Sequence, residues 1–359
     1  MTFYFLIFAV LTFFSFVEVF GLKKKDSTFF FIILSFLLFL LSFLRWETGT
    51  DWEPYMNFFN SSDEWFIEGD FEWGFARFNE FVKIYFDNYT FFLFLLGAII
   101  FYLQSAAILK FSPYPILSLL VLWSTIFGNV FFVRQTVATV FLFFSIRYIQ
   151  EKKFWSFLSM IFLAMLFHRT SIVFIIAWWI YKLRLKPITL IIYVAISLSL
   201  SVLLAKLFES LGEFAGGVVQ QKIDLYLSDS ENSFGSKTSV AEIVAKGIIN
   251  KIFIFGIVTS MLGKITNKEP EFRGYFNLYW AGIVIYFSVV SISIVLVRFA
   301  LVYDMVLIII IPFVLKYTEN LYGRFFMFLM FVFYLLARFY TALTGNYIEL
   351  FVPFRTIFG

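Results

Sequence analysis

The sequence predicts an all-α, polytopic membrane protein, and three observations support that fold class. Of the 359 residues, 61% are hydrophobic and only 14% are charged, which is more apolar surface than a soluble fold could cover. Apolar runs of about 18 residues or more recur from end to end, the length that a helix needs to cross a bilayer. These runs lack the alternation of barrel strands, so helices are the expected spanning elements.

Clusters of basic residues indicate which loops face the cytoplasm, because cytoplasmic loops of membrane proteins are enriched in lysine and arginine. A first expected span, about 2–20, is followed by three lysines at 23–25 and by no small-residue cleavage site. We therefore expect a permanent span rather than a signal peptide. A second span, about 28–44, returns the chain to the outside at Arg45. The basic loops account for the net charge of +4, and no nucleic-acid partner is expected.

An outer-face insert at 45–89 interrupts the apolar sequence with charged and aromatic side chains, most of the charges acidic. Pro54 fits the first turn of a short helix that has Asp51 near its N-terminus. Further along, an amphipathic helix is expected to lie in the membrane interface. For this helix, a structural collar and a direct role in substrate binding are both open. Its expected apolar face is Phe71, Phe75, Phe78, Val82 and Tyr85, and its expected polar face is Glu72, Asn79, Glu80 and Lys83.

Two apolar runs, about 115–149 and about 154–183, are each too long for one crossing of a core about 30 Å thick at about 1.5 Å per residue. The expected breaks are Gly128-Asn129 in the first run and His168 to Ser171 in the second. Both breaks fall on the outer side. They place Arg134 and Gln135 at the outer mouth of a span and His168 between two short half-runs, which are tolerated inside a bundle or along a cavity.

A second outer-face insert is expected at 208–245. It carries several glycines and a polar run from Ser228 to Ser239, and a lid over the site and a passive loop are both open for it. With the spans that follow, the count reaches about twelve, with both termini outside. The whole chain, 1–359, is expected to form a single integral membrane domain. No internal repeat or matched pair of broken helices is visible, which argues against a transporter.

In this topology, charged side chains from separated parts of the sequence come together near the outer face. A charge at the centre of a spanning helix costs about 2.5–3.5 kcal/mol on insertion scales, so such charges suggest function. A single arginine at a span end is equally explained as a snorkelling anchor. A group of arginines suits a dianion or a pyrophosphate, which guanidinium binds through paired hydrogen bonds. The predicted group is Arg45, Asp51, Arg134, His168, Arg169 and Arg298.

His168, the single histidine of the chain, and Asp51 are the alternative candidates for a general base. An imidazole takes up a proton near neutral pH, although it could equally serve as a neutral hydrogen-bond partner. Ser171 would share a helix face with His168 and could orient its ring. An ion pair between Asp51 and Arg45 would keep the carboxylate ionised. We therefore assign the base to His168 and an organising role to Asp51, and we expect Asp304 to pair with an arginine from another span.

No metal or cofactor is expected. The chain has no cysteine, which excludes disulfides, thiolate metal sites and cysteine nucleophiles. One histidine among scattered carboxylates is a weak metal signal.

Four motifs follow one another in the first half of the chain. They are Arg45-x-x-x-Gly49-Thr50-Asp51-x-x-x-Tyr55, Glu72-x-Gly74-Phe75, Arg134-Gln135-x-x-Ala138 and Ala164-x-x-Phe167-His168-x-x-Ser171. Their order and spacing resemble the EpsG-like branch of the Wzy-type polysaccharide repeat-unit polymerases, most closely over about 1–180. Arg298 and the tail Pro353-Phe354 are weaker matches. The family commonly has tyrosine where this chain has Phe354, so the tail is given no catalytic role.

The resemblance implies a metal-independent glycosyltransferase of the bacterial inner membrane, with a fold resembling the GT-C type. Such enzymes join repeat units carried on undecaprenyl pyrophosphate, at the periplasmic or outer face, into O-antigen, capsule or exopolysaccharide. The arginines would stabilise the pyrophosphate leaving group. Implied partners are the lipid-linked donor and acceptor, the bilayer, and chain-length regulator and flippase proteins of the same pathway. The substrate-binding candidates are Arg45, Tyr55, Glu72, Arg134, Gln135, Arg169 and Arg298.

Three alternatives from other classes remain open. An O-antigen ligase would use similar chemistry with a different acceptor. A lipid-linked oligosaccharide flippase would also bind pyrophosphate, but it needs basic residues along a central cavity rather than on one face. A membrane O-acyltransferase would use the histidine but would leave the arginine group unexplained.

The asymmetry of the basic loops predicts the topology directly. A tag inserted near Asp63 or Asn232 should be reachable from outside intact spheroplasts, and a tag near Lys24 or Lys268 should not. The measurement is labelling by a membrane-impermeant reagent. Labelling near Lys24 from outside would invert the topology and move the proposed site to the cytoplasm.

Overall fold

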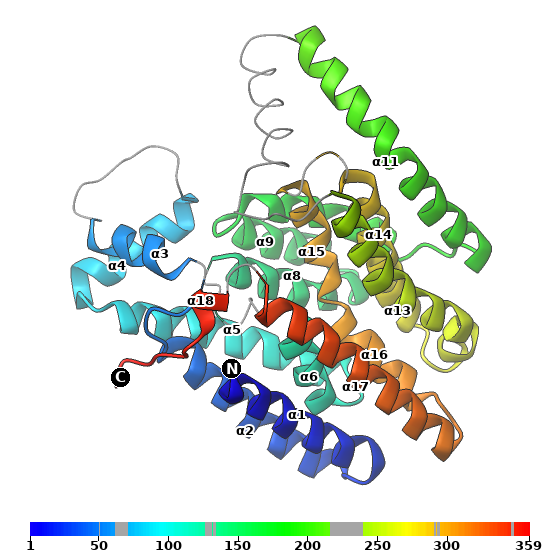
Figure 1. Cartoon of the computed structure of the whole chain (residues 1–359), viewed down its shortest axis with the longest axis horizontal. Coiled ribbons are helices and arrows are strands. Elements are labelled where there is room, and N and C mark those ends of the chain that lie inside the picture. The colour runs from blue at the N-terminus through cyan, green and yellow to red at the C-terminus, as the bar shows by residue number, and fades with distance from the viewer. Residues whose placement is uncertain are drawn as a thin grey trace. The chain divides into compact units, whose positions relative to one another are not determined.

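The computed structural model describes residues 1–49, 51–61, 71–125, 131, 134–215, 240–290, 292, 295–345 and 348–359 (Figure 1). Over these ranges the chain is helical, and one isolated antiparallel bridge, between Arg45 and Thr356, takes the place of any sheet. The all-α class predicted from the sequence is confirmed.

Six helices in these ranges are long and apolar enough to cross a membrane, which confirms a polytopic membrane protein. They are Thr2–Phe20, Lys24–Phe43, Tyr89–Phe111, Val244–Lys268, Arg298–Lys316 and Leu321–Leu343. Shorter apolar helices are Pro115–Thr125, Phe154–Met165, Arg169–Ile180 and Pro187–Leu200. The count of about twelve spans stays a prediction, because short segments cross a bilayer only inside a bundle or along a cavity.

One of the two long apolar runs breaks at the predicted place. Helix α9 (Phe154–Met165) ends before His168, and a 3₁₀ segment, η1 (Arg169–Ile176), follows it. In the other run, α6 (Pro115–Thr125) and α8 (Arg134–Gln150) lie on either side of Gly128-Asn129. That dipeptide lies outside the described residues, as does 216–239 of the second predicted insert. Helices α11 (Pro187–Ala215) and α13 (Val240–Lys268) flank this segment.

The chain divides into two compact units, Met1–Ile175 with Leu307–Gly359, and Ile176–Val306. The first unit is built around α6, in which every residue from Pro115 to Ser124 is buried. Four helices pack around it: α1 (Thr2–Phe20), α2 (Lys24–Phe43), α16 (Leu307–Lys316) and α17 (Leu321–Leu343). A helix that is apolar on every side belongs in the interior of a fold, and α6 occupies that place in this unit.

A carboxylate from α1 caps the buried N-terminus of α6. Glu18 is itself buried, and its two oxygens accept hydrogen bonds from the Ile116 N–H at 3.0 Å and the Leu117 N–H at 2.8 Å. The Ser27 hydroxyl also donates to it. The first N–H groups of a helix have no partner within the helix, and a negative charge there is favoured by the helix dipole. Glu18 therefore fixes the end of α6 against α1.

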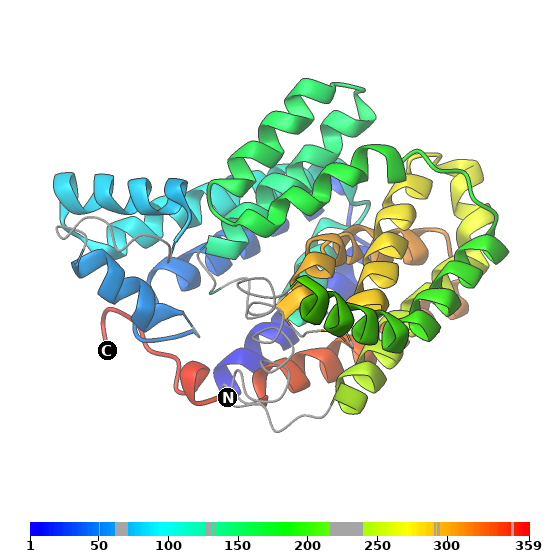
Figure 2. The same ribbon diagram turned by 90° about the horizontal axis from the view of Figure 1, so that it is seen from above.

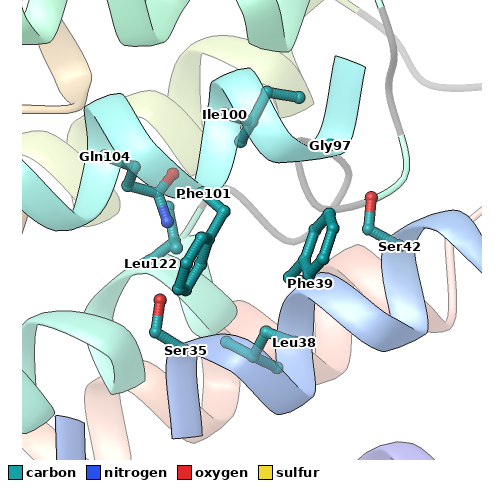
Figure 3. Close-up of a pocket in the computed structure, with 9 residues that line it drawn as sticks. All are labelled: Ser35, Leu38, Phe39, Ser42, Gly97, Ile100, Phe101, Gln104 and Leu122. Atoms are coloured by element: carbon teal, nitrogen blue, oxygen red, sulfur yellow. The ribbon is translucent and has the colours of Figure 1, made fainter. Parts of the chain in front are cut away.

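Helices α2 and α5 (Tyr89–Phe111) enclose a small cavity of about 40 Å³, drawn in Figure 3. The rings of Phe39 and Phe101 stack there with centroids 5.5 Å apart, and a Cβ at Gly97 would lie 3.0 Å from the Phe39 ring. The remaining lining residues include Ser35, Ser42 and Gln104. The cavity has room for only a few water molecules and contains none of the predicted site residues.

The first predicted insert folds into two helices, α3 (Trp52–Asn60) and α4 (Trp73–Phe86), in the same unit. They share a core of buried aromatic and aliphatic side chains with the start of α5. Phe75 and Val82 lie on the buried face, as expected. Three other assignments were wrong: Glu72 and Asn79, expected on the polar face, are buried, and Tyr85 is 70% exposed. Packing of α4 against α3 and α5 selects the face that carries Phe75, Asn79 and Val82.

The second unit is built around α14 (Phe272–Val289), which packs against α10 (Ala177–Ile180), α11, α13 and α15 (Arg298–Asp304). An ion pair within this unit joins Lys251 on α13 to Asp304 on α15. The Lys251 Nζ lies 2.5 Å from Oδ1 and 2.7 Å from Oδ2 of Asp304. The expected arginine partner of Asp304 is therefore a lysine. This charge pair lies within helices long enough to span a membrane, where partners keep the cost of burial tolerable.

Candidate functional site

A single carboxylate, that of Glu72, connects three elements of the first unit. Its Oε2 accepts a hydrogen bond from the Arg134 guanidinium at 2.8 Å. Its Oε1 accepts the backbone N–H of Arg169 at 3.1 Å, and His168 Nδ1 lies 3.6 Å from the same oxygen. The sequence placed Glu72 among the substrate-binding candidates. Its position at the junction of α4, α8 and η1 indicates that it organises the other residues.

The position of Glu72 follows from the close packing of the start of α4 against the end of α9. Glu72 is the N-cap residue of α4, and its own side chain makes no capping bond to that helix. A Cβ at Gly74 would come within 2.5 Å of the Leu166 Cβ and 2.7 Å of the Leu166 carbonyl oxygen. The Phe75 N–H donates to that same carbonyl at 3.1 Å. Glycine at position 74 is therefore what lets Glu72 reach across to the N-terminus of η1.

Arg134, the first residue of α8, lies between Glu72 and two aromatic rings. Its guanidinium carbon is 4.9 Å from the centre of the Phe71 ring and 5.8 Å from that of Tyr55, within the range of a cation–π interaction. The Arg134 side chain keeps 21% of its surface exposed. The neighbouring Gln135 is half-buried and stays a predicted ligand.

Electrostatics keep the Glu72 carboxylate ionised. Burial by itself raises its pKa, but the nearby His168 imidazole, the Arg134 guanidinium and the Arg169 N–H outweigh that effect. Together they lower the pKa of Glu72 from 4.5 to about 2. At neutral pH the site therefore contains a fixed negative charge between an imidazole and an arginine.

His168 is 8% exposed, and neither of its ring nitrogens has a hydrogen-bond partner. Ser171, which was expected to orient the ring, is fully buried with an unpartnered hydroxyl; its backbone N–H donates to the His168 carbonyl at 3.1 Å. Glu72 instead lies beside the ring, with its Oε1 3.6 Å from His168 Nδ1. The side chain of Arg169 is exposed, so its positive charge faces outward while its N–H is held by Glu72.

Asp51 lies at the N-terminus of α3, as predicted, but its hydrogen-bond partner is Tyr55 and not Arg45. The Tyr55 hydroxyl donates to Asp51 Oδ2 at 3.3 Å. Burial, and to a smaller extent the Asp51 charge, raises the pKa of Tyr55, so the phenol stays protonated and remains a donor. Arg45 is only 1% exposed, and its Nε and one terminal nitrogen make no hydrogen bond. It lies over the Phe131 ring at 5.9 Å. Burial lowers the pKa of Arg45 to about 10, which leaves it charged at neutral pH.

Arg298, the last of the predicted group, is the first residue of α15 in the second unit, and its part in the site stays a prediction. Across the described ranges of the chain, no group of three His, Cys, Asp or Glu side chains is placed to hold a metal ion. The site residues that the structure brings together are thus Tyr55, Glu72, Arg134, His168 and Arg169, with Asp51 held through Tyr55.

Two features of this site are absent from the sequence interpretation. One is the role of Glu72 as the common partner, and the other is the aromatic wall formed by Phe71 and Tyr55. The motif Glu72-x-Gly74-Phe75 carries a signal for the first, since a glycine two residues after a carboxylate at a helix start permits a close approach of two chain segments. The motif does not reveal which distant segment approaches Gly74; in the structure it is the end of α9 at Leu166.

Replacing Gly74 by alanine should separate α4 from the end of α9. The new methyl group overlaps Leu166, so we expect a loss of about 1–3 kcal/mol in the free energy of unfolding, measured by unfolding of the purified protein in detergent. Gly256→Ala is the matched control, because a Cβ there meets nothing within 4 Å; it should be neutral or stabilise by about 0.5–1 kcal/mol. Equal effects of the two changes would refute the close-contact interpretation.

Replacing Glu72 by glutamine should make the free energy of unfolding less sensitive to low pH. A carboxyl whose pKa is lowered from 4.5 to about 2 on folding stabilises the fold fully above its ordinary pKa and loses that contribution as the pH falls through the folded value. The difference between wild type and Glu72→Gln should reach about 2–3 kcal/mol at pH 7 and shrink from pH 4.5 downward. Glu80→Gln, on the same helix, breaks a more exposed pair with Arg77 and should cost under about 1 kcal/mol. A difference that does not change with pH would exclude the carboxylate charge as the cause.

Comparison with known proteins identifies the family of the chain. The model of the EpsG family matches residues 28–356, nearly the whole length. No curated protein and no solved structure matches the chain. The match includes all four motifs and the residues around Glu72, and EpsG is a Wzy-like polysaccharide polymerase family. The chain therefore belongs to the EpsG family of polysaccharide polymerases.

Proposed function

We propose that this polymerase joins oligosaccharide repeat units carried on undecaprenyl pyrophosphate, at the outer face of the bacterial inner membrane. The observation that carries the proposal is the group around Glu72. It combines one imidazole with two arginines, Arg134 partly exposed and Arg169 exposed. A glycosyl transfer from a lipid pyrophosphate needs these two functions, a base for the acceptor and positive charge for the leaving group.

In the proposed reaction, the acceptor is a sugar hydroxyl at the non-reducing end of a lipid-linked repeat unit. Its oxygen forms a bond to the anomeric carbon of the donor glycan, and the bond from that carbon to the pyrophosphate oxygen breaks. The electron pair of the broken bond leaves with the polyprenyl pyrophosphate. The hydroxyl proton passes to His168. No metal is required, because Arg134 and Arg169 supply the positive charge at the leaving group.

His168 is suited to this role through Glu72. The carboxylate lies 3.6 Å from Nδ1, and a negative charge there favours the tautomer that carries its proton on Nδ1. Nε2 then carries an unprotonated lone pair without a hydrogen-bond partner, and because Nε2 is buried in this structure, the substrate must uncover it. Catalytic contacts are often long in a free enzyme and shorten when substrate binds.

Asp51 organises the opposite side of the site. It accepts a hydrogen bond from Tyr55, and the Tyr55 ring in turn faces the Arg134 guanidinium. This chain of contacts keeps Arg134 directed between Glu72 and the aromatic wall. We further propose Arg298 and Gln135 as contacts of the lipid-linked substrate, and a chain-length regulator and a flippase of the same pathway as partners.

The test is polymer length made from purified lipid-linked repeat units by the protein in detergent or vesicles. His168→Gln should leave single repeat units, with a loss of about 10²–10⁴-fold in rate, the usual contribution of a positioned base. Arg134→Lys keeps the charge but loses the planar fork, and should also lose most activity. The matched control is Arg338→Lys, because Arg338 lies on α17 and donates to the hydroxyl of its helix neighbour Tyr334.

The outcomes separate the alternatives. Long chains at the wild-type rate from His168→Gln would place the base elsewhere, with Asp51 as the first candidate. Transfer of a whole glycan to a different acceptor, without chain growth, would indicate an O-antigen ligase. Movement of the lipid-linked unit across vesicles without a new glycosidic bond would indicate a flippase.

A further inference from the structure

The C-terminal segment of the chain lies along the loop that carries Arg45. Figure 2 shows the red tail beside the blue segment that leads into α3. Two backbone hydrogen bonds bracket the bridge between Arg45 and Thr356. They run from the N–H groups of Trp46 and Ile357 to the carbonyls of Arg355 and Leu44, at 2.9 and 3.0 Å. Both strands of this contact belong to the first unit.

Further contacts extend the pairing on both sides. The Gly49 N–H donates to the Leu350 carbonyl at 2.8 Å. The Arg355 N–H donates to the Thr48 hydroxyl at 3.3 Å, and the Arg355 guanidinium forms an ion pair with Glu47. Consequently, each residue from Trp46 to Gly49 is bonded to the tail through either its backbone or its side chain.

The tail also reaches the start of α8 through aromatic rings. Phe131, three residues before Arg134, contacts Phe351 and Phe354 with ring centroids 5.8 and 6.1 Å apart. Phe354 in turn stacks on Phe3 of α1 at 4.8 Å. Phe131 is therefore in contact with the tail, and the tail is in contact with α1.

The loop needs these contacts because its backbone is unusual. Glu47 has a φ of 45° and Gly49 a φ of 110°, in the left-handed region that non-glycine residues rarely adopt. Such conformations persist only where the surroundings determine them. The tail supplies partners to all four residues from 46 to 49 through their N–H groups or side-chain oxygens, and it forms a backbone bridge with Arg45, whose side chain is almost entirely buried.

We propose that the C-terminal tail is a positioning element of the polymerase site, with the exposed Arg355–Glu47 ion pair as one of its contacts. The docked tail fixes the 45–49 turn, which leads directly into Asp51 and α3, and it fixes Phe131 before Arg134. It thereby sets the distance between the Asp51–Tyr55 side and the Glu72–Arg134 side of the site. The inference rests on the proposed function for its activity readout only. The tail, which has no catalytic role predicted from the sequence, thus has a structural one.

Exchanging the charges of Glu47 and Arg355 tests the contribution of their ion pair to docking of the tail. Arg355→Glu places a second carboxylate beside Glu47 and should undock the tail, with kcat falling by about 10–100-fold, the usual effect of misplacing site residues by about 1 Å. KM for the lipid-linked unit should change less. Glu47→Arg alone should do the same. The double variant Glu47→Arg with Arg355→Glu restores the opposite charges and should recover kcat to within a few-fold. Lys110→Glu, which breaks a cytoplasmic-loop pair with Glu151, is the matched control and should leave kcat unchanged.

A second readout does not depend on polymer formation. The chain has no cysteine, so Thr48→Cys introduces a single thiol at a fully buried position under the tail. Maleimide should label this thiol slowly when the rest of the chain is wild type. With Arg355→Glu the labelling rate should rise about tenfold or more, because labelling then follows local opening. With both charges exchanged, labelling should again be slow.

Rapid labelling with Arg355→Glu at an unchanged kcat would overturn the proposal, as would a double variant that stays inactive while its thiol is protected. If the wild type made no polymer at all, the proposed function would fail, and the labelling results would still decide whether Arg355 docks the tail.

Discussion

The interaction on which the site depends is the pairing of one buried carboxylate with groups from three segments. Glu72 meets the Arg134 guanidinium, the Arg169 N–H and the side of His168 that carries Nδ1. Removing a carboxylate from water is costly unless its charge is matched. These three partners match it, and the low pKa of Glu72 is the result. The same contacts fix the end of α9, the start of η1 and the start of α8 relative to α4, so the electrostatics of the candidate site and the local architecture have one cause.

A comparable solution appears where polar groups lie deep in the apolar bundle. Glu18 caps the N-terminus of α6, and Lys251 pairs with Asp304 between α13 and α15. Water is scarce in such places, so each charge must be matched by the protein itself. Glu18 joins α1 to the central helix α6 of the first unit, and the Lys251–Asp304 pair joins two helices that pack against α14 in the second unit. Polar residues within the bundle therefore specify which helices meet, while the apolar surface only requires that they meet.

The 56 phenylalanines serve two different purposes. Many are exposed on the outer surface of candidate spans, as Phe13, Phe29 and Phe333 are, and suit contact with lipid. Others shape the site: Phe71 faces the Arg134 guanidinium, and Phe131 lies between Arg45 and the tail. An aromatic ring beside a guanidinium adds electrostatic attraction, whereas a ring in lipid adds only apolar surface. The residue type is the same, and its neighbours determine what it does.

The sequence by itself determined the class of fold, the position of most helices, the break at His168 and the family. These properties depend on local composition, on the length of apolar runs and on motif spacing, all of which can be read along the chain. Candidate residues for the site could also be named from the sequence, because charges are rare in such a chain. Their partners could not. Asp51 bonds Tyr55 rather than Arg45, Ser171 does not orient His168, and Asn79 lies on the inner face of its helix. Each of these outcomes depends on which distant segment packs alongside. Leu166 packs against Gly74 beside Glu72, and the tail pairs with the backbone of Arg45. Contacts between residues tens or hundreds of positions apart leave no periodic pattern in one sequence, so only the tertiary structure decided them.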